Sequence, residues 1–230
     1  MKLSHLFRSR RSSQSPVLPE PQALDSTPIR QARLVVLDLE TSGLDTQRDD
    51  ILSIGAVAVR QGTLFMADQF ERTLHQPDHQ PNQATLLHEI APCEIQRGQP
   101  VEAALLDFMH YAGTSVLIAF HAGFEQRMLT RSLRQTLGCR LQHRFLDVAE
   151  LAPMLYPEAA PRCGSLDDWQ SHFQLTNSER HNASADAMVT AEILLILLNR
   201  LDKQGTNSLA ELNNRVSDWR RLNRARAIRL

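Results

Sequence analysis

Residues 34–41, with the sequence LVVLDLET, join four consecutive apolar residues to two carboxylates. Two of the four apolar residues are β-branched, and such an uninterrupted run predicts a strand that is buried on both faces. Because side chains alternate along a strand, Asp38 and Glu40 are expected on one face, about 7 Å apart. Two acids at this spacing repel each other unless a cation lies between them, and an oxygen-only site favours Mg²⁺ or Mn²⁺. The alternative for an isolated Asp-x-Glu pair is a strand end exposed to solvent.

The segments that follow predict an α/β domain. Strands at 51–60 and 64–73 come after short turns, which predicts an antiparallel meander with the acidic strand. A short strand at 115–120 leads into a helix at 124–137, and this strand-to-helix crossover indicates an α/β fold. A short edge strand is expected at 144–145, and further helices are expected at 84–90, 101–111, 147–154, 165–173 and 184–201.

Both ends of the chain differ from this domain, which is expected to span residues 33–202. Residues 1–32 are rich in Ser and Pro, lack apolar periodicity and have no acid before residue 20, so they predict a flexible basic arm. This arm either contacts polyanions or keeps the chain in solution. The basic residues within positions 1–19 are Lys2, Arg8, Arg10 and Arg11.

Residues 203–230 are expected to form a basic amphipathic helix. From residue 209 on, apolar residues recur every three or four positions, and arginines crowd the positions between them. The apolar stripe of this helix either packs within the chain or docks on a partner such as a polymerase, and its basic side could contact nucleic acid.

Composition narrows the protein class. A chain of 230 residues with 42% hydrophobic residues can bury one sizeable core. No apolar run reaches the roughly 18 residues of a membrane span, and no secretory signal is present, so a cytoplasmic protein without membrane contact is expected. Cys93, Cys139 and Cys163 lie far apart without a Cys-x-x-Cys pair, which predicts neither a disulfide framework nor a zinc site.

Further titratable residues fall at the expected junctions between sheet and helices. Glu125 lies in the first turn of the helix that leaves the sheet, and His181 and Asp186 lie at the start of the last domain helix. Ligands in open α/β sheets gather at such strand ends. Taken singly, His181 would be a surface histidine and Asp186 a favourable charge in a first helical turn. Together with Asp38 and Glu40, they indicate a metal site.

Three segments give this chain a resemblance to a known family. Residues 38–44, DLETSGL, resemble the Asp-x-Glu-Thr-Thr-Gly-Leu motif of the DEDDh-class 3′–5′ exonucleases, the epsilon-type proofreading family. Residues 51–57, ILSIGAV, resemble the strand that follows this motif, and residues 181–186, HNASAD, resemble the third motif of the family. The resemblance spans residues 33–201 in the expected order. It implies a single domain with the ribonuclease H-like fold, a mixed β-sheet flanked by helices.

The second motif departs from the family pattern. The family has His-Asn-x-x-Phe-Asp where residues 120–125 read FHAGFE, so His121 replaces the usual Asn and Glu125 replaces the usual Asp. The extra methylene moves the carboxylate outward by about 1.5 Å. Since Mg²⁺ demands near-ideal octahedral geometry, this change is expected to weaken a second metal or to leave it bound through water.

The resemblance also implies roles for the residues of the site. Asp38 would bridge two Mg²⁺ or Mn²⁺ ions, Glu40 and Asp186 would complete the first metal site, and Glu125 would support the second. His181 would act as the general base, because an imidazole is suited to removing a proton near neutrality. The positions that would contact the terminal nucleotide are Thr41, Leu44, His121 and Phe124.

The implied activity is hydrolysis of phosphodiesters by a two-metal site, which clamps the attacking and leaving oxygens. The enzyme would release nucleoside 5′-monophosphates from the 3′ ends of single-stranded DNA or short RNA, in DNA replication or repair. The competing hypothesis is a catalytically weakened module of the same fold that binds nucleic acid or associates with a polymerase.

Overall fold

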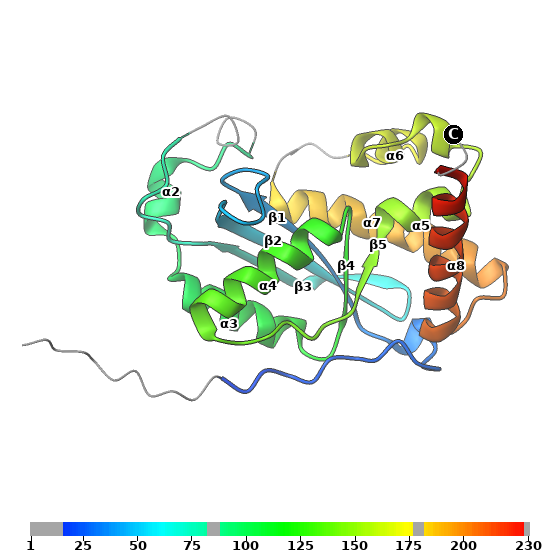
Figure 1. Cartoon of the computed structure of the whole chain (residues 1–230), viewed down its shortest axis with the longest axis horizontal. Coiled ribbons are helices and arrows are strands. Elements are labelled where there is room, and N and C mark those ends of the chain that lie inside the picture. Colours follow the sequence, from blue (N-terminus) through cyan, green and yellow to red (C-terminus); the bar gives the residue numbers. More distant parts are fainter. Residues whose placement is uncertain (1–15, 82–87, 177–181, 228–230) are drawn as a thin grey trace, which may run out of the picture.

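The computed structural model describes residues 16–81, 88–176 and 182–227, and residues 34–147 contain a five-stranded sheet (Figure 1). The strands lie in the order β3-β2-β1-β4-β5. β1 pairs antiparallel with β2, β2 pairs antiparallel with β3, and β4 and β5 run parallel to β1. Their bounds are β1 Leu34–Thr41, β2 Ile51–Arg60, β3 Thr63–Thr73, β4 Val116–Ala119 and β5 Phe145–Asp147.

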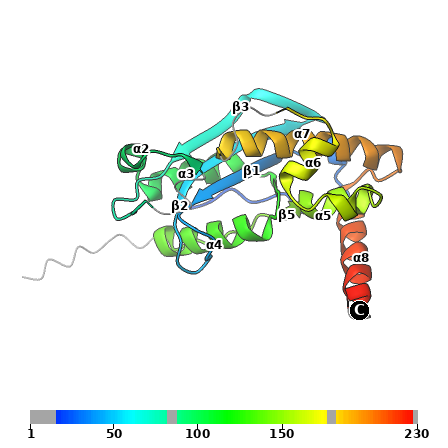
Figure 2. The same ribbon diagram turned by 90° about the horizontal axis from the view of Figure 1, so that it is seen from above.

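Helices flank both faces of the sheet, which confirms the predicted fold class (Figure 2). The helix α2 was not predicted, and most of the predicted helix 84–90 lies outside the described residues. None of the described helices is long and apolar enough to cross a membrane. The helices are α2 Pro92–Arg97, α3 Val101–Ala112, α4 Gly123–Leu137, α5 Val148–Leu155, α6 Leu166–His172, α7 Ala183–Lys203 and α8 Leu209–Ala227, with 3₁₀ turns at Ile29–Gln31 and Ala160–Arg162.

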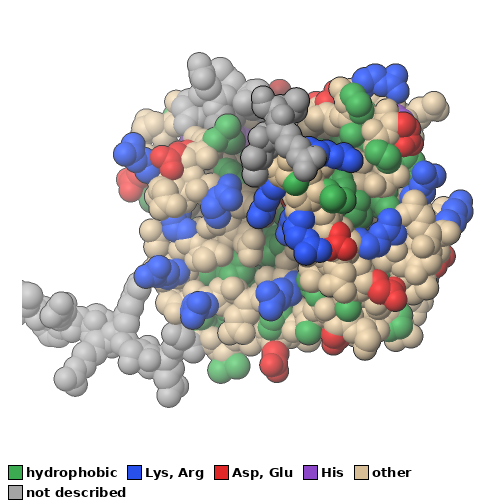
Figure 3. All heavy atoms as spheres, turned by 45° about the vertical axis from the view of Figure 1, so that its right-hand side comes forward, with side chains coloured by type: hydrophobic (Ala, Val, Ile, Leu, Met, Phe, Trp, Pro, Cys, Tyr) green, Lys and Arg blue, Asp and Glu red, His purple; other side chains and the backbone are tan. Residues whose placement is uncertain are grey.

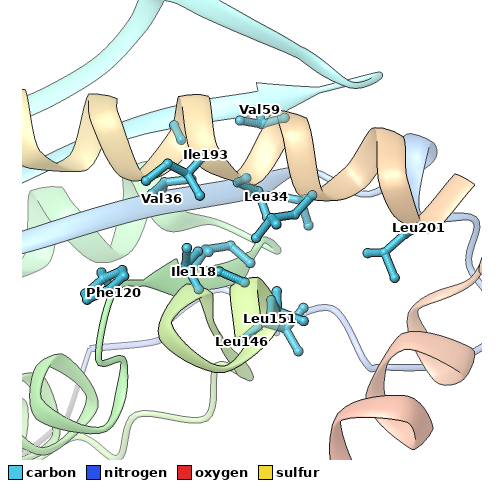
Figure 4. Packing of buried hydrophobic residues seen from close by; sticks show 14 of the residues in the cluster. Leu34, Val36, Val59, Ile118, Phe120, Leu146, Leu151, Ile193 and Leu201 are labelled. Atoms are coloured by element: carbon cyan, nitrogen blue, oxygen red, sulfur yellow. The ribbon is translucent and has the colours of Figure 1, made fainter. Parts of the chain in front are cut away.

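β1 is buried on both faces, as its apolar run predicts. Leu34 and Val36 face the core formed with α5, α7 and α8, where Ile193 and Leu201 also pack (Figure 4). Val35 and Leu37, which alternate with them along β1, face a second core, formed with α3 and α4. With a period of two, Asp38 falls on the same face as Leu34 and Val36. The acidic end of β1 therefore lies on the side of the sheet that α7 covers.

Packed structure begins before the expected boundary at residue 33. Ile29 and Ala32 are buried in the core, and the Gln22 backbone N–H donates to the carbonyl of Thr114. This differs from the expected flexible lead-in because the apolar residues of the segment cover the core where β1 begins. Lys2, Arg8, Arg10 and Arg11 of the predicted arm lie outside the described residues.

The apolar stripe of α8 packs within the chain. Leu209, Leu212 and Val216 are buried in the core that α5 and α7 share, and α8 contacts α5 directly. On α8, the Nε of Arg220 donates to both carboxylate oxygens of Glu150, at 2.8 Å to Oε1 and 2.9 Å to Oε2. The first half of α8 is thus part of the folded domain.

Candidate active site

Three of the predicted acids come together at one point. Asp38 and Glu40 of β1 and Asp186 of α7 each offer a carboxylate oxygen, and these oxygens lie within 4.8 Å of one another. β1 and α7 are separated by more than 140 residues of sequence, so the tertiary fold alone brings them together.

A glycine explains how α7 reaches the acids of β1. Gly55 of β2 is the register partner of Asp38. A Cβ at Gly55 would lie 2.2 Å from the backbone of Ala183 and of Ser184, closer than any real contact. Only glycine therefore lets the start of α7 rest directly on β2, which places the first turn of α7, with Asp186, beside Asp38.

The start of α7 is fixed by its own cap as well. The Asn182 side chain accepts hydrogen bonds from the backbone N–H groups of Ser184 at 3.0 Å and Ala185 at 3.1 Å. This is the usual N-cap arrangement, which satisfies helix donors that have no partner within the helix. His181, the predicted general base, immediately precedes this cap and lies outside the described residues.

The electrostatics of the cluster fit a divalent cation. Burial raises the pKa of Glu40 to about 8, and repulsion from Asp186 adds to the effect. When no cation is present, repulsion between the three crowded carboxylates makes their charged forms less stable. A cation between them would offset this cost. Because the donors are all oxygen, the site suits hard ions such as Mg²⁺ or Mn²⁺.

Glu125 is not among the three acids whose carboxylate oxygens lie within 4.8 Å of one another, here called the three-carboxylate cluster. It belongs to the first turn of α4 and is only 4% exposed, and its Oε2 has no hydrogen-bond partner among the described residues. The pKa of Glu125 is raised to about 8, mainly by burial and in part by the nearby charge of Asp147. The longer side chain of glutamate thus ends in a dry environment beside a second acid.

Asp147 is a residue of this region that the sequence analysis did not assign to the site. It is the last residue of β5, and its Oδ1 accepts hydrogen bonds from the backbone N–H groups of His121 and Ala149, both at 2.9 Å. One side chain therefore caps α5 and also holds the turn between β4 and α4. The signal that could have indicated it is an acid at the carboxyl end of a parallel strand.

The turn that Asp147 holds has an unusual backbone conformation. His121 has φ of +62°, in the left-handed region. Apart from glycine, Asn, Asp and His tolerate this region best. This explains how His121 can stand where the family pattern has Asn: the position requires a residue that accepts a positive φ.

The other predicted contacts of the terminal nucleotide lie around the end of β1 and the start of α4. Thr41 is buried, and its Oγ1 donates to the carbonyl of Gly43 at 2.7 Å, so it shapes the turn after β1. Leu44, in the same turn, is 86% exposed. Phe124 is half-buried against the core of α3 and α4, next to Glu125. His121 is exposed.

Comparison with known proteins gives one family match and several relatives. The model of the RNase_T family, described as exonuclease, matches residues 35–194. DNA polymerase III PolC-type of Thermotoga petrophila is 30% identical over 184 residues, which cover 80% of this chain, and that of Bacillus subtilis is 27% identical over 201 residues, which cover 86%. The chain spans only 13% and 14% of the length of these two relatives.

Solved structures with the same fold include several nucleases. Escherichia coli exonuclease I in complex with a dT13 oligonucleotide has a TM-score of 0.64 and 14% identity, with 76% of this chain and 42% of that chain covered. Cell-death related nuclease 4 has a TM-score of 0.64 and 12% identity, with 74% and 64% covered. Exonuclease X in complex with 5′ overhanging duplex DNA has a TM-score of 0.56 and 22% identity, with 72% and 91% covered.

Proposed function

The chain belongs to the RNase_T exonuclease family, and from this premise we propose that it is a metal-dependent 3′–5′ exonuclease acting on single-stranded DNA or short RNA. Membership confirms the family predicted from the three motifs and makes the protein a nuclease. The direction of hydrolysis, the substrate and the metal ions are the parts proposed here. The products would be nucleoside 5′-monophosphates.

The observation that carries this proposal is the convergence of Asp38, Glu40 and Asp186. Asp38 would bridge two ions, Glu40 and Asp186 would complete the first metal site, and Glu125 would support the second. Bound Mg²⁺ or Mn²⁺ would polarise the phosphodiester and lower the pKa of the attacking water. The chain's own acids would hold these ions in place, and the ions would offset the repulsion between the crowded carboxylates.

Other residues would position the substrate and take up a proton. His181 would act as general base, since it directly precedes the cap of α7 and so is close in sequence to Asp186. Thr41 and Leu44, after β1, and His121 and Phe124, before and within α4, would contact the terminal nucleotide. In this arrangement the scissile bond would lie at the carboxyl end of β1.

A nucleic acid substrate agrees with the surface charge and with the relatives. The formal net charge is −1, yet Lys and Arg side chains gather around the hollow in the face that Figure 3 shows. The structures of exonuclease I with dT13 and of exonuclease X with overhanging duplex DNA support a DNA substrate. The likeness to DNA polymerase III PolC-type supports a role in replication, with a polymerase as partner.

A second candidate is a catalytically weakened module that binds nucleic acid or associates with a polymerase. The position of Glu125 favours it: this acid replaces the usual Asp, it interacts with the charge of Asp147, and it is not part of the three-carboxylate cluster. Release of mononucleotides separates the two functions.

The test is an incubation of the full chain with single-stranded DNA, duplex DNA and RNA of equal length, each with Mg²⁺ and with Mn²⁺. Substrates labelled at the 5′ end should shorten stepwise, and the products should be nucleoside 5′-monophosphates. Asp38→Ala should abolish this release, whereas Asp218→Asn, an exposed acid on α8, should leave it unchanged. Binding of the oligonucleotides without any release by the wild-type protein would instead establish the binding module.

A further inference from the structure

A groove lies between the loop that follows β1 and the exposed side of α4. We propose that this groove, termed the α4 groove, holds the sugar-phosphate backbone of a single-stranded nucleic acid whose 3′ end lies at the three carboxylates. The inference rests on the proposed function and adds the path of the bound strand. Figures 1 and 2 both place this loop beside α4.

The lining of the α4 groove is basic and polar. Arg127, Arg131 and Arg134 of α4 line it, and the remaining lining residues are all threonine and glutamine. Because the three arginines recur at helical spacing, they follow one side of α4 over about 10 Å. A row of guanidinium groups at this spacing, with no acid in the lining, is complementary to a chain of phosphates.

The three arginines differ in their contacts with the rest of the protein. Arg131 donates to the backbone carbonyl of Asp49 and lies 3.9 Å from the carboxylate of Asp50, so it ties the loop to α4. Arg127 and Arg134 are exposed and form no ion pair with a described residue. Arg131 thus builds the groove, and Arg127 and Arg134 are the side chains that can turn to a phosphate.

The α4 groove starts at the candidate active site. Arg127 follows Glu125 by two residues at the start of α4, so this end of the groove lies within one helical turn of Glu125. The opposite wall, at Thr46 and Gln47, comes shortly after Leu44, the proposed contact of the terminal nucleotide. A strand whose last nucleotide lies at the carboxylates can therefore leave along the groove. The arginines would also offset the repulsion between the acidic cluster and the phosphates.

The chemistry of the lining predicts contacts to the backbone and not to the bases. Arginine, threonine and glutamine side chains donate hydrogen bonds to phosphate oxygens, and no aromatic side chain for base stacking lines the groove. Binding should therefore depend on strand length and salt, with little dependence on sequence. DNA and RNA strands share this backbone charge and should respond alike.

The experiment compares two double variants, both in an Asp38→Ala background so that the strand is not degraded. Arg127→Ala with Arg134→Ala removes two charges from the α4 groove. Arg140→Ala with Arg144→Ala removes two exposed charges near the start of β5, at the end of the sheet away from the carboxyl end of β1. Binding of fluorescent strands of twelve and of two nucleotides, as DNA and as RNA, is measured by anisotropy over a salt series.

The groove variant should bind the twelve-nucleotide strands roughly tenfold more weakly, and its salt slope should fall by about 1.4, since each single-strand phosphate contact contributes about 0.7. Its affinity for the two-nucleotide strands should change far less, and the control variant should bind both lengths within about twofold of the parent. Equal affinities and equal salt slopes in the two variants would overturn the inference. Thermal unfolding of both variants shows that each is folded.

This outcome can be told apart from failure of the proposed function. If the wild-type chain releases nucleotides while the groove variant binds like the control, the strand takes another path and the function stands. If the wild-type chain degrades no nucleic acid while the groove variant loses affinity for the long strands only, the exonuclease function fails and the groove inference stands.

Discussion

At the scale of single residues, the protonation of the site is coupled to folding. Burial and neighbouring acids raise the folded-state pKa of Glu40 and of Glu125 to about 8, well above the ordinary value for a glutamate. Between about pH 4.5 and pH 8 the folded state therefore binds more protons than the unfolded state. Stability should be highest at low pH within this window and should fall as the pH rises through 8.

The first prediction follows from this linkage. In the metal-free protein, the free energy of unfolding should decrease from pH 5 to pH 8, and Glu40→Gln should flatten this dependence because a neutral amide has no proton to lose. Added Mg²⁺ or Mn²⁺ should restore stability mainly at the high-pH end. Urea unfolding at several pH values, with Glu102→Gln as a control at an exposed position, measures the effect. A steeper fall in Glu40→Gln than in wild type would contradict the assignment.

The second prediction concerns Asp147 as a positioning residue. Asp147→Ala leaves the backbone N–H groups of His121 and Ala149 without their acceptor, which should cost about 1–3 kcal/mol of stability and disorder the turn before Glu125. Asp147→Asn keeps an accepting oxygen and should preserve the turn. Nuclease rate and unfolding free energy are measured for both variants.

The two variants separate two roles of Asp147, as a hydrogen-bond acceptor for the turn and as a negative charge. If Asp147→Asn retains stability and most of the nuclease rate while Asp147→Ala loses both, hydrogen bonding to the turn is what matters. Equal losses in the two variants would show that the negative charge itself is required. The Mg²⁺ dependence of the rate should shift only in Asp147→Ala, because Glu125 then loses its fixed position.

At the scale of elements, the contact between β2 and the start of α7 assembles the site. This contact depends on Gly55, since any Cβ there collides with the backbone of Ala183 and Ser184. α7 also packs on β1 and β2 along most of its length. The rest of α7 can therefore stay in place while its first turn, which holds Asp186, is displaced.

The third prediction is that Gly55→Ala reduces nuclease activity more than it reduces stability. Overpacking of this kind costs about 1–3 kcal/mol, but a shift of the first turn of α7 separates Asp186 from Asp38 and Glu40. Gly164→Ala is the matched control, because a Cβ at Gly164 meets no atom within 4 Å. Activity, metal affinity and thermal unfolding are compared. Wild-type metal affinity in Gly55→Ala would show that this contact does not set the site.

At the scale of the whole molecule, α8 completes the domain. The buried side chains of Leu209, Leu212 and Val216 fill the core between α5 and α7, and Arg220 pairs with Glu150 at the start of α5. Since the apolar stripe is used inside the chain, a partner that binds α8 would have to contact its exposed side. Leu222, which is 61% exposed, lies beyond the buried part of the stripe.

The fourth prediction is that removal of residues 205–230 destabilises the domain by several kcal/mol. Burial of each large apolar side chain contributes about 1.5–3 kcal/mol, and three of them are lost together. Removal of residues 218–230 keeps all three and should cost far less. Urea unfolding of the two truncated chains provides the comparison. Similar stability of the longer truncation and the full chain would show that α8 is dispensable for folding.

The sequence by itself determined most of the strands and helices and the identity of the three acids that converge. Apolar runs and their periodicity depend on local backbone geometry, so the strands 34–41 and 51–60 and the helix 124–137 were predicted close to their observed bounds. The alternation of side chains also put Asp38 and Glu40 on one face. The three motifs identified the family, because residue types at fixed spacing are a property of the sequence.

Only the tertiary structure decided which acids meet. Asp186 reaches Asp38 because Gly55 admits α7 to the surface of β2, a contact between segments that are far apart in the chain. Glu125 ends beside Asp147 because β5 lies next to β4, a pairing that local sequence does not encode. Likewise, residues 16–32 look like a polar lead-in locally, and the apolar stripe of α8 did not by itself reveal what it packs against. Both are packed because the ends of the core need covering. Such long-range packing depends on the whole fold and cannot be predicted from a local sequence pattern.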